Sequence, residues 1–191
     1  MTLNEEAFFM KSRRESRPVI AVCGDSDASE AAVTAAAELG AAIASEGWHL
    51  ICGGGGGVME AACRGFADAR NKTDFNIVTI GVLPAGDAAW ANEYVDIPVA
   101  TGMGYARNAI IVQTAHAVVA IGGRAGTLSE IAYAWQFNKP VVALKTGSGW
   151  ADELAGRKID DRRKDVIHEA RNAGRAVEII REALAGDVKS K

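Results

Sequence analysis

The sequence predicts an α/β protein with a doubly wound, mostly parallel sheet of about seven strands and helices on both faces. Short apolar runs alternate along the chain with longer segments whose apolar residues recur at helical spacing. Such alternation is typical of parallel βαβ units, because parallel neighbouring strands need a crossover connection. Glycine-rich turns follow several of the apolar runs, where a strand would pass directly into a helix.

The stretch Val118–Leu144 shows this pattern most clearly. It reads VVAIGGRAGTLSEIAYAWQFNKPVVAL, with a strand-like run, three glycines, and then a helix that Gly126-Thr127 opens. Asn138, Lys139 and Pro140 stop the helix before the next β-branched run. The start of a helix offers unpaired N–H groups and a partial positive charge, so this turn is the expected place for a phosphate.

The other elements follow from the same two patterns. The predicted strands are Val19–Cys23, Trp48–Cys52, Asn76–Leu83, Tyr94–Pro98, Val118–Ile121, Val141–Leu144 and Val166–Ala170. The other predicted helices are Ser29–Ser45, Val58–Ala69, Tyr105–Ala115 and Arg175–Leu184. The charged stretch Asp152–Lys164 has no clear pattern, and no element is predicted there.

The 191 residues have the size of one domain with one well-buried core. We predict a single domain over residues 18–185, a flexible N-terminal tail over 1–17, where no periodicity is found, and a C-terminal tail over 186–191. A hydrophobic fraction of 49% with 21 glycines fits a soluble α/β protein rich in tight turns.

Charge and cysteine content limit the partners and the compartment. A net charge of −3 without a dense Lys/Arg block predicts no nucleic-acid partner. No run approaches the ~18 apolar residues that span a bilayer, and the N-terminus lacks the pattern of a signal peptide, so no membrane partner is expected. Three cysteines without paired spacing (Cys23, Cys52 and Cys63) favour buried thiols and a cytoplasmic location.

In a doubly wound sheet the loops that follow the strands emerge at one edge, the carboxyl rim, and ligands bind there. The glycine-rich turns of the first two-thirds of the chain are therefore expected to converge on that rim. The predicted ligand- and phosphate-binding residues are Gly24, Ser26, Gly54, Gly55, Gly56, Gly57, Met103, Asn108, Gly122, Gly123, Gly126 and Thr127.

Known phosphate-binding motifs do not match these turns. The dinucleotide fingerprint fails because Val58 stands where its last glycine belongs, and neither glycine cluster carries the Gly-Lys-Ser/Thr of a P-loop. Hydride transfer and nucleoside triphosphate hydrolysis are therefore disfavoured. The histidines are scattered and no ligand spacing typical of a metal site occurs, so no metal is predicted.

Two charged residues on the rim, Glu130 and Arg107, are the catalytic candidates. We place Glu130 in the first turn of the helix that Gly126-Thr127 opens, and Arg107 in the first turn of the preceding helix. For Glu130 the alternative is a capping box with Thr127, in which the carboxylate folds back on that residue's N–H. For Arg107 the alternative is an ordinary solvated residue, although a cation at a helix N-terminus is slightly unfavourable.

Three blocks resemble the signature blocks of the LOG-like, or "lonely guy", superfamily. They are GGGGGVMEAACRG (Gly53–Gly65), YARN (Tyr105–Asn108) and IGGRAGTLSE (Ile121–Glu130), in the expected order. Within the superfamily they are more similar to the molybdenum-cofactor-carrier-like branch than to the cytokinin-activating phosphoribohydrolases. The resemblance covers about Val19 to Leu144 and implies a Rossmann-like nucleotide-binding domain, assembled as a homodimer or homotetramer.

Two functions follow from the resemblance. The carrier branch binds molybdenum cofactor, a phosphorylated pterin, so a bound molybdenum cofactor or nucleotide is expected here. The hydrolase branch cleaves nucleoside 5′-monophosphates to free base and ribose 5-phosphate without a cofactor, and its catalytic Glu and Arg match Glu130 and Arg107. No Schiff-base lysine is identifiable, so the "lysine decarboxylase" label often given to such proteins has no support.

The sequence leaves the choice between these functions open. Ile121 replaces the motif's proline, Arg124-Ala125 lengthens the loop by one residue, and Asn108 replaces a lysine. These departures concern base specificity and turnover. Carrier and hydrolase share one phosphate site, and a scaffold with a vestigial pocket is the third alternative.

Overall fold

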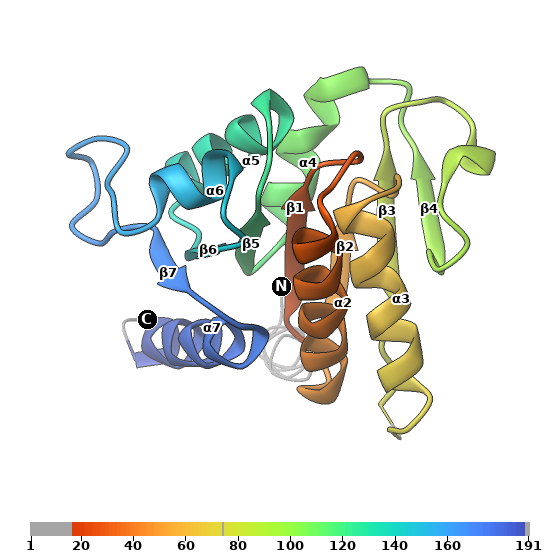
Figure 1. The fold of residues 1–191 in the computed structure, drawn as a ribbon, viewed down its shortest axis with the longest axis horizontal. Coiled ribbons are helices and arrows are strands. Elements are labelled where there is room, and N and C mark those ends of the chain that lie inside the picture. Colours follow the sequence, from red (N-terminus) through yellow and green to blue (C-terminus); the bar gives the residue numbers. More distant parts are fainter. Residues whose placement is uncertain (1–16, 74, 190–191) are drawn as a thin grey trace, which may run out of the picture.

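A seven-stranded sheet in the order β4-β3-β2-β1-β5-β6-β7 forms the centre of the computed structural model, which describes residues 17–73 and 75–189, with side chains up to 186 (Figure 1). Every pairing in it is parallel. The strands are β1 Val19–Gly24, β2 His49–Cys52, β3 Thr79–Leu83, β4 Ile97–Ala100, β5 Ala117–Ile121, β6 Val141–Leu144 and β7 His168–Ala170. The predicted doubly wound α/β fold is confirmed.

Helices cover both faces of this sheet. They are α2 Glu30–Ser45, α3 Val58–Arg70, α4 Asn108–Thr114, α5 Ala125–Gln136, α6 Gly149–Leu154 and α7 Ala173–Lys189, with short 3-10 helices η1 Ala88–Trp90 and η2 Gly104–Arg107. Because side chains alternate along a strand, Ile20 and Val22 pack with α2, α3 and α7, whereas Ala21 and Cys23 pack with α4, α5 and α6. Two core layers therefore sandwich the sheet.

Helices α2 and α3 lie side by side in direct backbone contact (Figure 1). A Cβ on Gly40 would fall 1.9 Å from the carbonyl oxygen of Ala62, and one on Gly65 would fall 2.0 Å from that of Ala37. Only glycine fits at either crossing position. This close packing fixes the start of α3, and therefore the end of the glycine-rich turn that precedes it.

The largest differences from the predicted elements lie in the middle and at the end of the chain. The fourth strand is Ile97–Ala100 instead of Tyr94–Pro98, because Asp96 is taken up by polar contacts that precede the strand. The third strand begins only at Thr79, and the predicted helix Tyr105–Ala115 divides into η2 and α4. Helix α6, which no pattern indicated, starts at Gly149.

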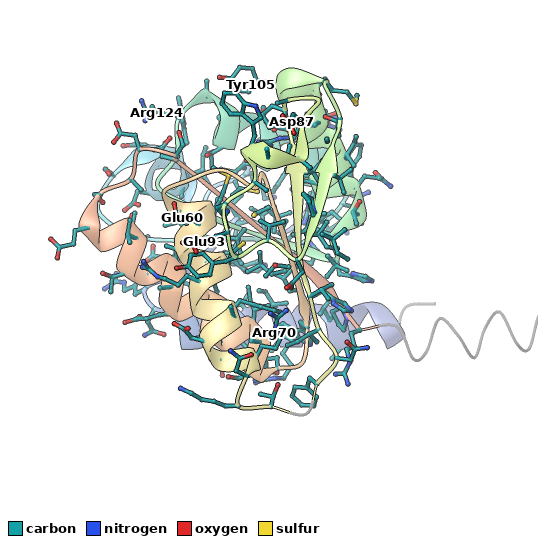
Figure 2. The ribbon with its side chains drawn as sticks, turned by 90° about the vertical axis from the view of Figure 1, so that its right-hand side faces the viewer. Glu60, Arg70, Asp87, Glu93, Tyr105 and Arg124 are labelled. Atoms are coloured by element: carbon teal, nitrogen blue, oxygen red, sulfur yellow. The ribbon has the colours of Figure 1, made fainter. Side chains whose placement is uncertain are left out.

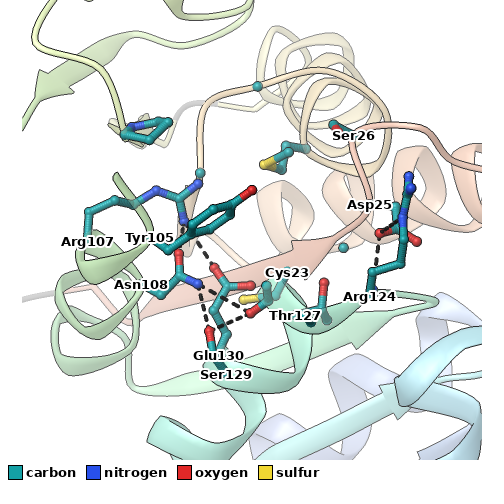
Figure 3. Close-up of a pocket in the computed structure, with 17 residues that line it drawn as sticks. Cys23, Asp25, Ser26, Tyr105, Arg107, Asn108, Arg124, Thr127, Ser129 and Glu130 are labelled. Atoms are coloured by element: carbon teal, nitrogen blue, oxygen red, sulfur yellow. Dashed lines mark hydrogen bonds and ion pairs between the residues drawn. The ribbon is translucent and has the colours of Figure 1, made fainter. Parts of the chain in front are cut away.

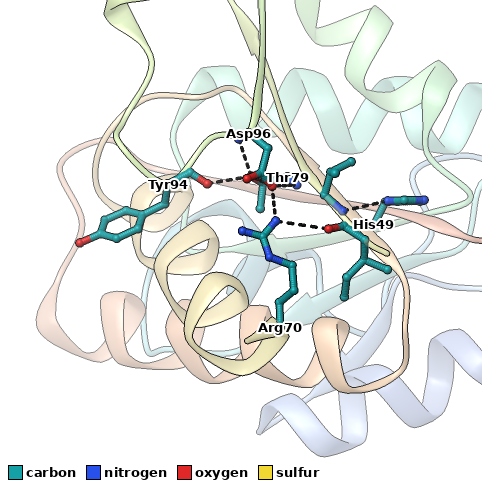
Figure 4. A network of polar contacts seen from close by, with 7 residues as sticks. His49, Arg70, Thr79, Tyr94 and Asp96 are labelled. Carbon is teal, nitrogen blue, oxygen red and sulfur yellow. Dashed lines mark hydrogen bonds and ion pairs between the residues drawn. The ribbon is translucent and has the colours of Figure 1, made fainter. Parts of the chain in front are cut away.

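A polar network anchors the first residues of β3 and β4 (Figure 4). The carboxylate of Asp96 accepts hydrogen bonds from the N–H and hydroxyl of Thr79, at 2.8 and 3.0 Å, and pairs with Arg70 at the end of α3. His49 Nδ1 accepts the N–H of Val78 at 3.1 Å. These contacts satisfy backbone groups where the regular ladder has not yet begun.

The ends of the chain are described in part. Of the predicted tail 1–17 only Arg17 belongs to the described residues. Its guanidinium donates to the Gly47 carbonyl at 3.1 Å and lies over the ring of Phe75. At the other end α7 is longer than the predicted Arg175–Leu184 and continues to Lys189, into the segment predicted as a tail.

Cys23, Cys52 and Cys63 are buried free thiols, as predicted. None of the described helices combines the length and the apolar character that crossing a bilayer requires. Over residues 17–73 and 75–189, no three or more His, Cys, Asp or Glu side chains group in a way that could hold a metal ion.

Candidate functional site

A cavity of about 690 Å³ opens at the carboxyl rim of the sheet (Figure 3). Strand β1 lies between β2 and β5. From β1 the chain adds β2, β3 and β4 on one side, and it then returns to add β5, β6 and β7 on the other, so the direction in which strands are added reverses beside β1. Doubly wound sheets bind their ligands at such switch points, because the two neighbouring loops turn to opposite faces and leave a crevice. We call this hollow the rim cavity; the end of β1 and residues that follow β1, β2, β3, β4 and β5 line it.

The start of α5 supplies hydrogen-bond donors to the rim cavity. The helix begins at Ala125, and its first helical hydrogen bond runs from the N–H of Leu128 to the carbonyl of Arg124 at 2.9 Å. The N–H groups of Ala125, Gly126 and Thr127 therefore precede the helical ladder, and none has an acceptor among the described residues. All three residues line the rim cavity, so its wall carries unpaired donors and the positive end of a helix dipole.

The predicted capping box is wrong. Because α5 starts at Ala125, Thr127 is its third residue and Glu130 lies in the second turn instead of the first. A capping-box acid must lie three residues after the cap, so Glu130 is too far into the helix to fold back on its end. Its carboxylate points toward Arg107 instead, with Glu130 Oε1 3.3 Å from Arg107 Nη1.

The loop before α5 turns its carbonyl and N–H groups in opposite directions. Gly122 and Gly123 have φ of 58° and 100°, a region that glycine alone enters readily. Their carbonyls accept hydrogen bonds from the first N–H groups of α6, at Ala151 and Trp150. The unpredicted helix α6 thus supports this loop from behind, while the N–H groups of the loop face the rim.

Asp25 holds three rim loops together. Its carboxylate accepts the N–H groups of Gly123 and Arg124, at 3.2 and 3.1 Å, and the Nε–H of Arg124 at 3.1 Å. Its backbone carbonyl accepts the N–H of Val58, at the start of α3, at 3.0 Å. The carboxylate takes up only the two N–H groups before α5, which leaves those of the first helical turn free for a ligand.

Arg107 and Glu130 form a buried ion pair in the rim cavity. Their side chains are 11% and 8% exposed. Arg107 also donates to the side-chain oxygen of Asn108, whose amide group donates to the Gly126 carbonyl at 3.2 Å and to the Ser129 hydroxyl at 2.8 Å. Asn108 therefore links η2 and α4 to the first turn of α5. Its side chain is fully used in positioning the others.

The glycine-rich turn after β2 forms another part of the cavity wall. A Cβ on Gly53 would lie 2.3 Å from Arg107 Nη2, so the guanidinium lies directly against this residue. Asn92 donates its side-chain amide to the carbonyls of Gly54 and Gly55, at 3.2 and 2.9 Å, and Gly54 donates to Cys52 Sγ at 3.3 Å. A polyglycine segment loses much conformational entropy on ordering, and these contacts oppose that loss.

Burial decides the protonation of Glu130. Loss of hydration raises its pKa to about 7, although Arg107 and a hydrogen bond from the Cys23 thiol both lower it. Burial, and then the charge of Glu130, raise the pKa of Cys23 well above its usual value, so the thiol stays protonated and donates. A carboxyl group that titrates near neutral pH inside a cavity is typical of functional sites.

The structure brings together most of the residues that the sequence indicated. Eight of them line the rim cavity: Gly24, Ser26, Gly55, Arg107, Asn108, Gly126, Thr127 and Glu130. Six predicted residues lie outside its lining: Gly54, Gly56, Gly57, Met103, Gly122 and Gly123. Most of these support the turns: Gly54 faces Leu83 of the sheet, Gly57 packs against the carbonyls of Asp25 and Ser26, and the glycine pair holds α6.

Sequence reasoning missed several residues of the cavity wall. They include Cys23, Asp25, Gly53, Met59, Pro84, Tyr105, Arg124, Ala125 and Ser129. Tyr105 and Arg124 stand inside the YARN and IGGRAGTLSE blocks, so a reading of every position in those blocks would have found them. Gly53 and Met59 likewise stand inside the GGGGGVMEAACRG block, whereas Pro84 lies in an ordinary turn outside the three blocks, where no motif pointed to it.

Comparison with known proteins identifies the family of the chain. The model of the SLOG cluster4 family matches residues 17–177. The chain belongs to the SLOG cluster4 family. This family is LOG-like, which confirms the resemblance seen in the three sequence blocks.

Relatives of this SLOG cluster4 protein include an uncharacterized protein from Archaeoglobus fulgidus, 40% identical over 66% of this chain and 79% of the relative. Among solved structures it is similar to the molybdenum cofactor binding protein from Rippkaea orientalis, with a TM-score of 0.77 and 34% identity over 89% of this chain and 99% of that one. The molybdenum cofactor carrier protein from Chlamydomonas reinhardtii has a TM-score of 0.73 and 34% identity over 88% and 99% of the two chains.

The raised pKa of Glu130 predicts a specific dependence of stability on pH. The folded value of about 7 exceeds the ordinary 4.5, so folding binds this proton more tightly. That stabilisation is complete below pH ~4.5 and is lost as the pH rises through 7, by about 3 kcal/mol. Glu130→Gln cannot titrate, so the wild type should lose stability relative to it between pH 4.5 and 8.

Urea unfolding of both proteins at several pH values measures this difference, and all other titrating groups cancel in the comparison. A difference in unfolding free energy between wild type and Glu130→Gln that is constant from pH 4.5 to 8 would show that Glu130 is ionised over the whole range.

Proposed function

We propose that this SLOG cluster4 protein binds a phosphorylated, nucleotide-like small molecule in the rim cavity, in the manner of a molybdenum cofactor carrier. The observation that carries the proposal is the set of three unpaired N–H groups at Ala125, Gly126 and Thr127, which open into a cavity of about 690 Å³. A phosphate monoester supplies the acceptors and the negative charge that these donors and the dipole of α5 favour.

The rest of the cavity fits the remainder of such a ligand. Its volume lies within the range of pockets that take small molecules and cofactors. Arg107 provides a buried cation whose Nε–H has no acceptor among the described residues, so a donor remains for an oxygen of the ligand. No metal ion of the protein's own is needed in this scheme.

The relatives support a carrier role. Two of the similar solved proteins are described as binding or carrying molybdenum cofactor, and that cofactor is a phosphorylated pterin. Their similarity extends over nearly their whole length, so the rim loops of this chain have counterparts there. We further propose a cytoplasmic location, because the three cysteines are unpaired thiols, and a homodimer or homotetramer, as the LOG-like resemblance implies.

A charge placed at the α5 N-terminus tests the phosphate site. Gly126→Asp puts a carboxylate on the second residue of α5, where an acidic side chain stabilises a helix by roughly 0.3–1 kcal/mol. A Cβ there has only an ordinary contact, 4.0 Å from Tyr105 Cε1, so the variant should fold. We expect AMP to raise the melting temperature of the wild type and to have no such effect on Gly126→Asp, because the carboxylate repels the phosphate.

Gly174→Asp is the matched control, since Gly174 follows Ala173 at the start of α7 as Gly126 follows Ala125 at the start of α5. It should keep the full response to AMP. If Gly126→Asp responds to AMP as strongly as this control, the phosphate does not lie at α5.

Hydrolysis of a nucleoside 5′-monophosphate is the second candidate, favoured by the buried Arg107–Glu130 pair. With the phosphate at α5, the ionised carboxylate of Glu130 would stabilise positive charge at C1′ while water attacks that carbon. The glycosidic C–N bond breaks, the base leaves with the bonding electrons and takes up a proton, and ribose 5-phosphate remains.

The pKa of Glu130 then sets the pH dependence of the rate. The ionised fraction of a group with a pKa of about 7 increases about tenfold between pH 6 and 8, so kcat/KM for base release from AMP, which follows the ligand-free protein, should rise by that factor. Glu130→Gln should bind AMP and release no base. Base release by Glu130→Gln at the wild-type rate would exclude Glu130 from the reaction. Binding of AMP without base release by the wild type would favour the carrier function.

A further inference from the structure

Tyr105 is an exposed aromatic residue at the mouth of the rim cavity. It belongs to η2, lines the cavity, and is 82% exposed. Its side chain makes no hydrogen bond within the part of the chain that the structure describes, and its ring points toward the cavity (Figure 3). A tyrosine ring gains considerable free energy on burial, so an unpaired ring at a cavity mouth is well suited to a contact with a ligand.

The ring lies close to the proposed phosphate position. A Cβ built on Gly126 would be 4.0 Å from Tyr105 Cε1, so the ring edge lies beside the first turn of α5. Tyr105 and Arg124, which flank this helix start, project from the same end of the molecule, far from Arg70 (Figure 2). A group joined to the phosphate by a short linker is therefore within reach of this ring.

The other walls suit a flat, apolar ring. Met59 and Pro84 line the cavity with apolar atoms, and a Cβ on Gly55 would lie 3.2 Å from the methyl group of Met59, so this methyl group lies close to the glycine-rich turn. Of the other strongly exposed aromatic residues, neither Trp90 nor Trp150 lines the cavity. Tyr105 thus combines exposure with a position over the ligand site.

We infer that Tyr105 is the specificity-determining residue of the cavity and stacks on a heteroaromatic ring of the ligand. The site then takes phosphate esters that carry a planar nitrogen heterocycle, a nucleobase or a pterin, and discriminates against plain sugar phosphates. Stacking against an aromatic side chain tolerates different rings because each has a π face. The inference rests on the proposed function, since the phosphate at α5 fixes the other end of the ligand.

Two ligands that differ only in the ring separate stacking from phosphate binding. AMP and ribose 5-phosphate share the sugar and the phosphate, and calorimetric titration of each gives its Kd. The wild type should bind AMP about tenfold or more tightly than ribose 5-phosphate, as base–aromatic stacking commonly provides. Tyr105→Ala should raise the Kd of AMP by about that factor and leave the Kd of ribose 5-phosphate within twofold of the wild-type value.

Two further variants isolate the ring itself. Tyr105→Phe keeps the ring without the hydroxyl and should bind AMP like the wild type. Trp90→Ala removes an exposed aromatic residue from the other 3-10 helix, outside the cavity lining. It should change the Kd of neither AMP nor ribose 5-phosphate. Neopterin monophosphate, titrated in parallel, distinguishes a pterin site from a nucleobase site. Of AMP and neopterin monophosphate, the ligand that the wild type binds more tightly should bind more weakly to Tyr105→Ala.

The failures can be told apart. If Tyr105→Ala leaves the Kd of both ring ligands unchanged, or weakens ribose 5-phosphate equally, the stacking role is wrong while phosphate binding stands. Loss of AMP binding in Tyr105→Phe would assign the contact to the hydroxyl and overturn the inference. If the wild type binds none of the three phosphate esters, both the proposed function and this inference fall.

Discussion

Three backbone N–H groups at the start of α5 lack a partner in the described chain, and the surrounding structure keeps them open to the rim cavity. The carboxylate of Asp25 takes the two N–H groups before the helix and stops there. The Gly126 carbonyl is occupied by Asn108 and Ser129, which orients the first turn. Because unpaired donors beside a cavity are costly to leave without an acceptor, an anionic ligand is the natural complement of this arrangement.

The Arg107–Glu130 ion pair of the rim cavity is buried, whereas the side chains at the mouth of the cavity are exposed. Arg107 and Glu130 lie deep in the cavity, whereas Arg124 and Tyr105 stand at its mouth, 66% (side chain) and 82% exposed. Burial of Glu130 raises its pKa to about 7, so the cavity changes charge near neutral pH. Near neutral pH, Glu130 can therefore face a bound ligand either as a neutral carboxyl group or as a carboxylate. Only hydrolysis needs the carboxylate, so both binding and hydrolysis are compatible with this site.

The sequence predicts the fold well, because apolar runs and helical spacing record which residues are buried. It also predicts the convergence of the glycine turns, since alternating strands and helices imply parallel strands, whose following loops emerge at one edge of the sheet. Contacts between distant residues are another matter. The Thr127–Glu130 spacing suggested a capping box, but α5 starts two residues earlier, at Ala125, and Arg107 pairs with the Glu130 carboxylate from 23 positions away. Local spacing carries no information about such a competitor.

Other errors have the same origin. Helix α6 is short, and it is held by the carbonyls of Gly122 and Gly123, which only the folded chain brings near. The start of β4 is displaced because Asp96 is drawn into contacts with Thr79 and Arg70. Tyr105 looked like one residue of a helix, and its position at the cavity mouth becomes clear only when η2 is placed beside α5.

The central claim is that a phosphate is held by the first N–H groups of α5. It is tested most directly by following the backbone amide resonances in ¹H–¹⁵N NMR spectra while inorganic phosphate and then AMP are added. We predict saturable shifts at Ala125, Gly126 and Thr127, with the corresponding amides at the start of α7, from Ala173 to Arg175, unchanged. Saturable binding that leaves the three α5 amides unmoved would contradict the account.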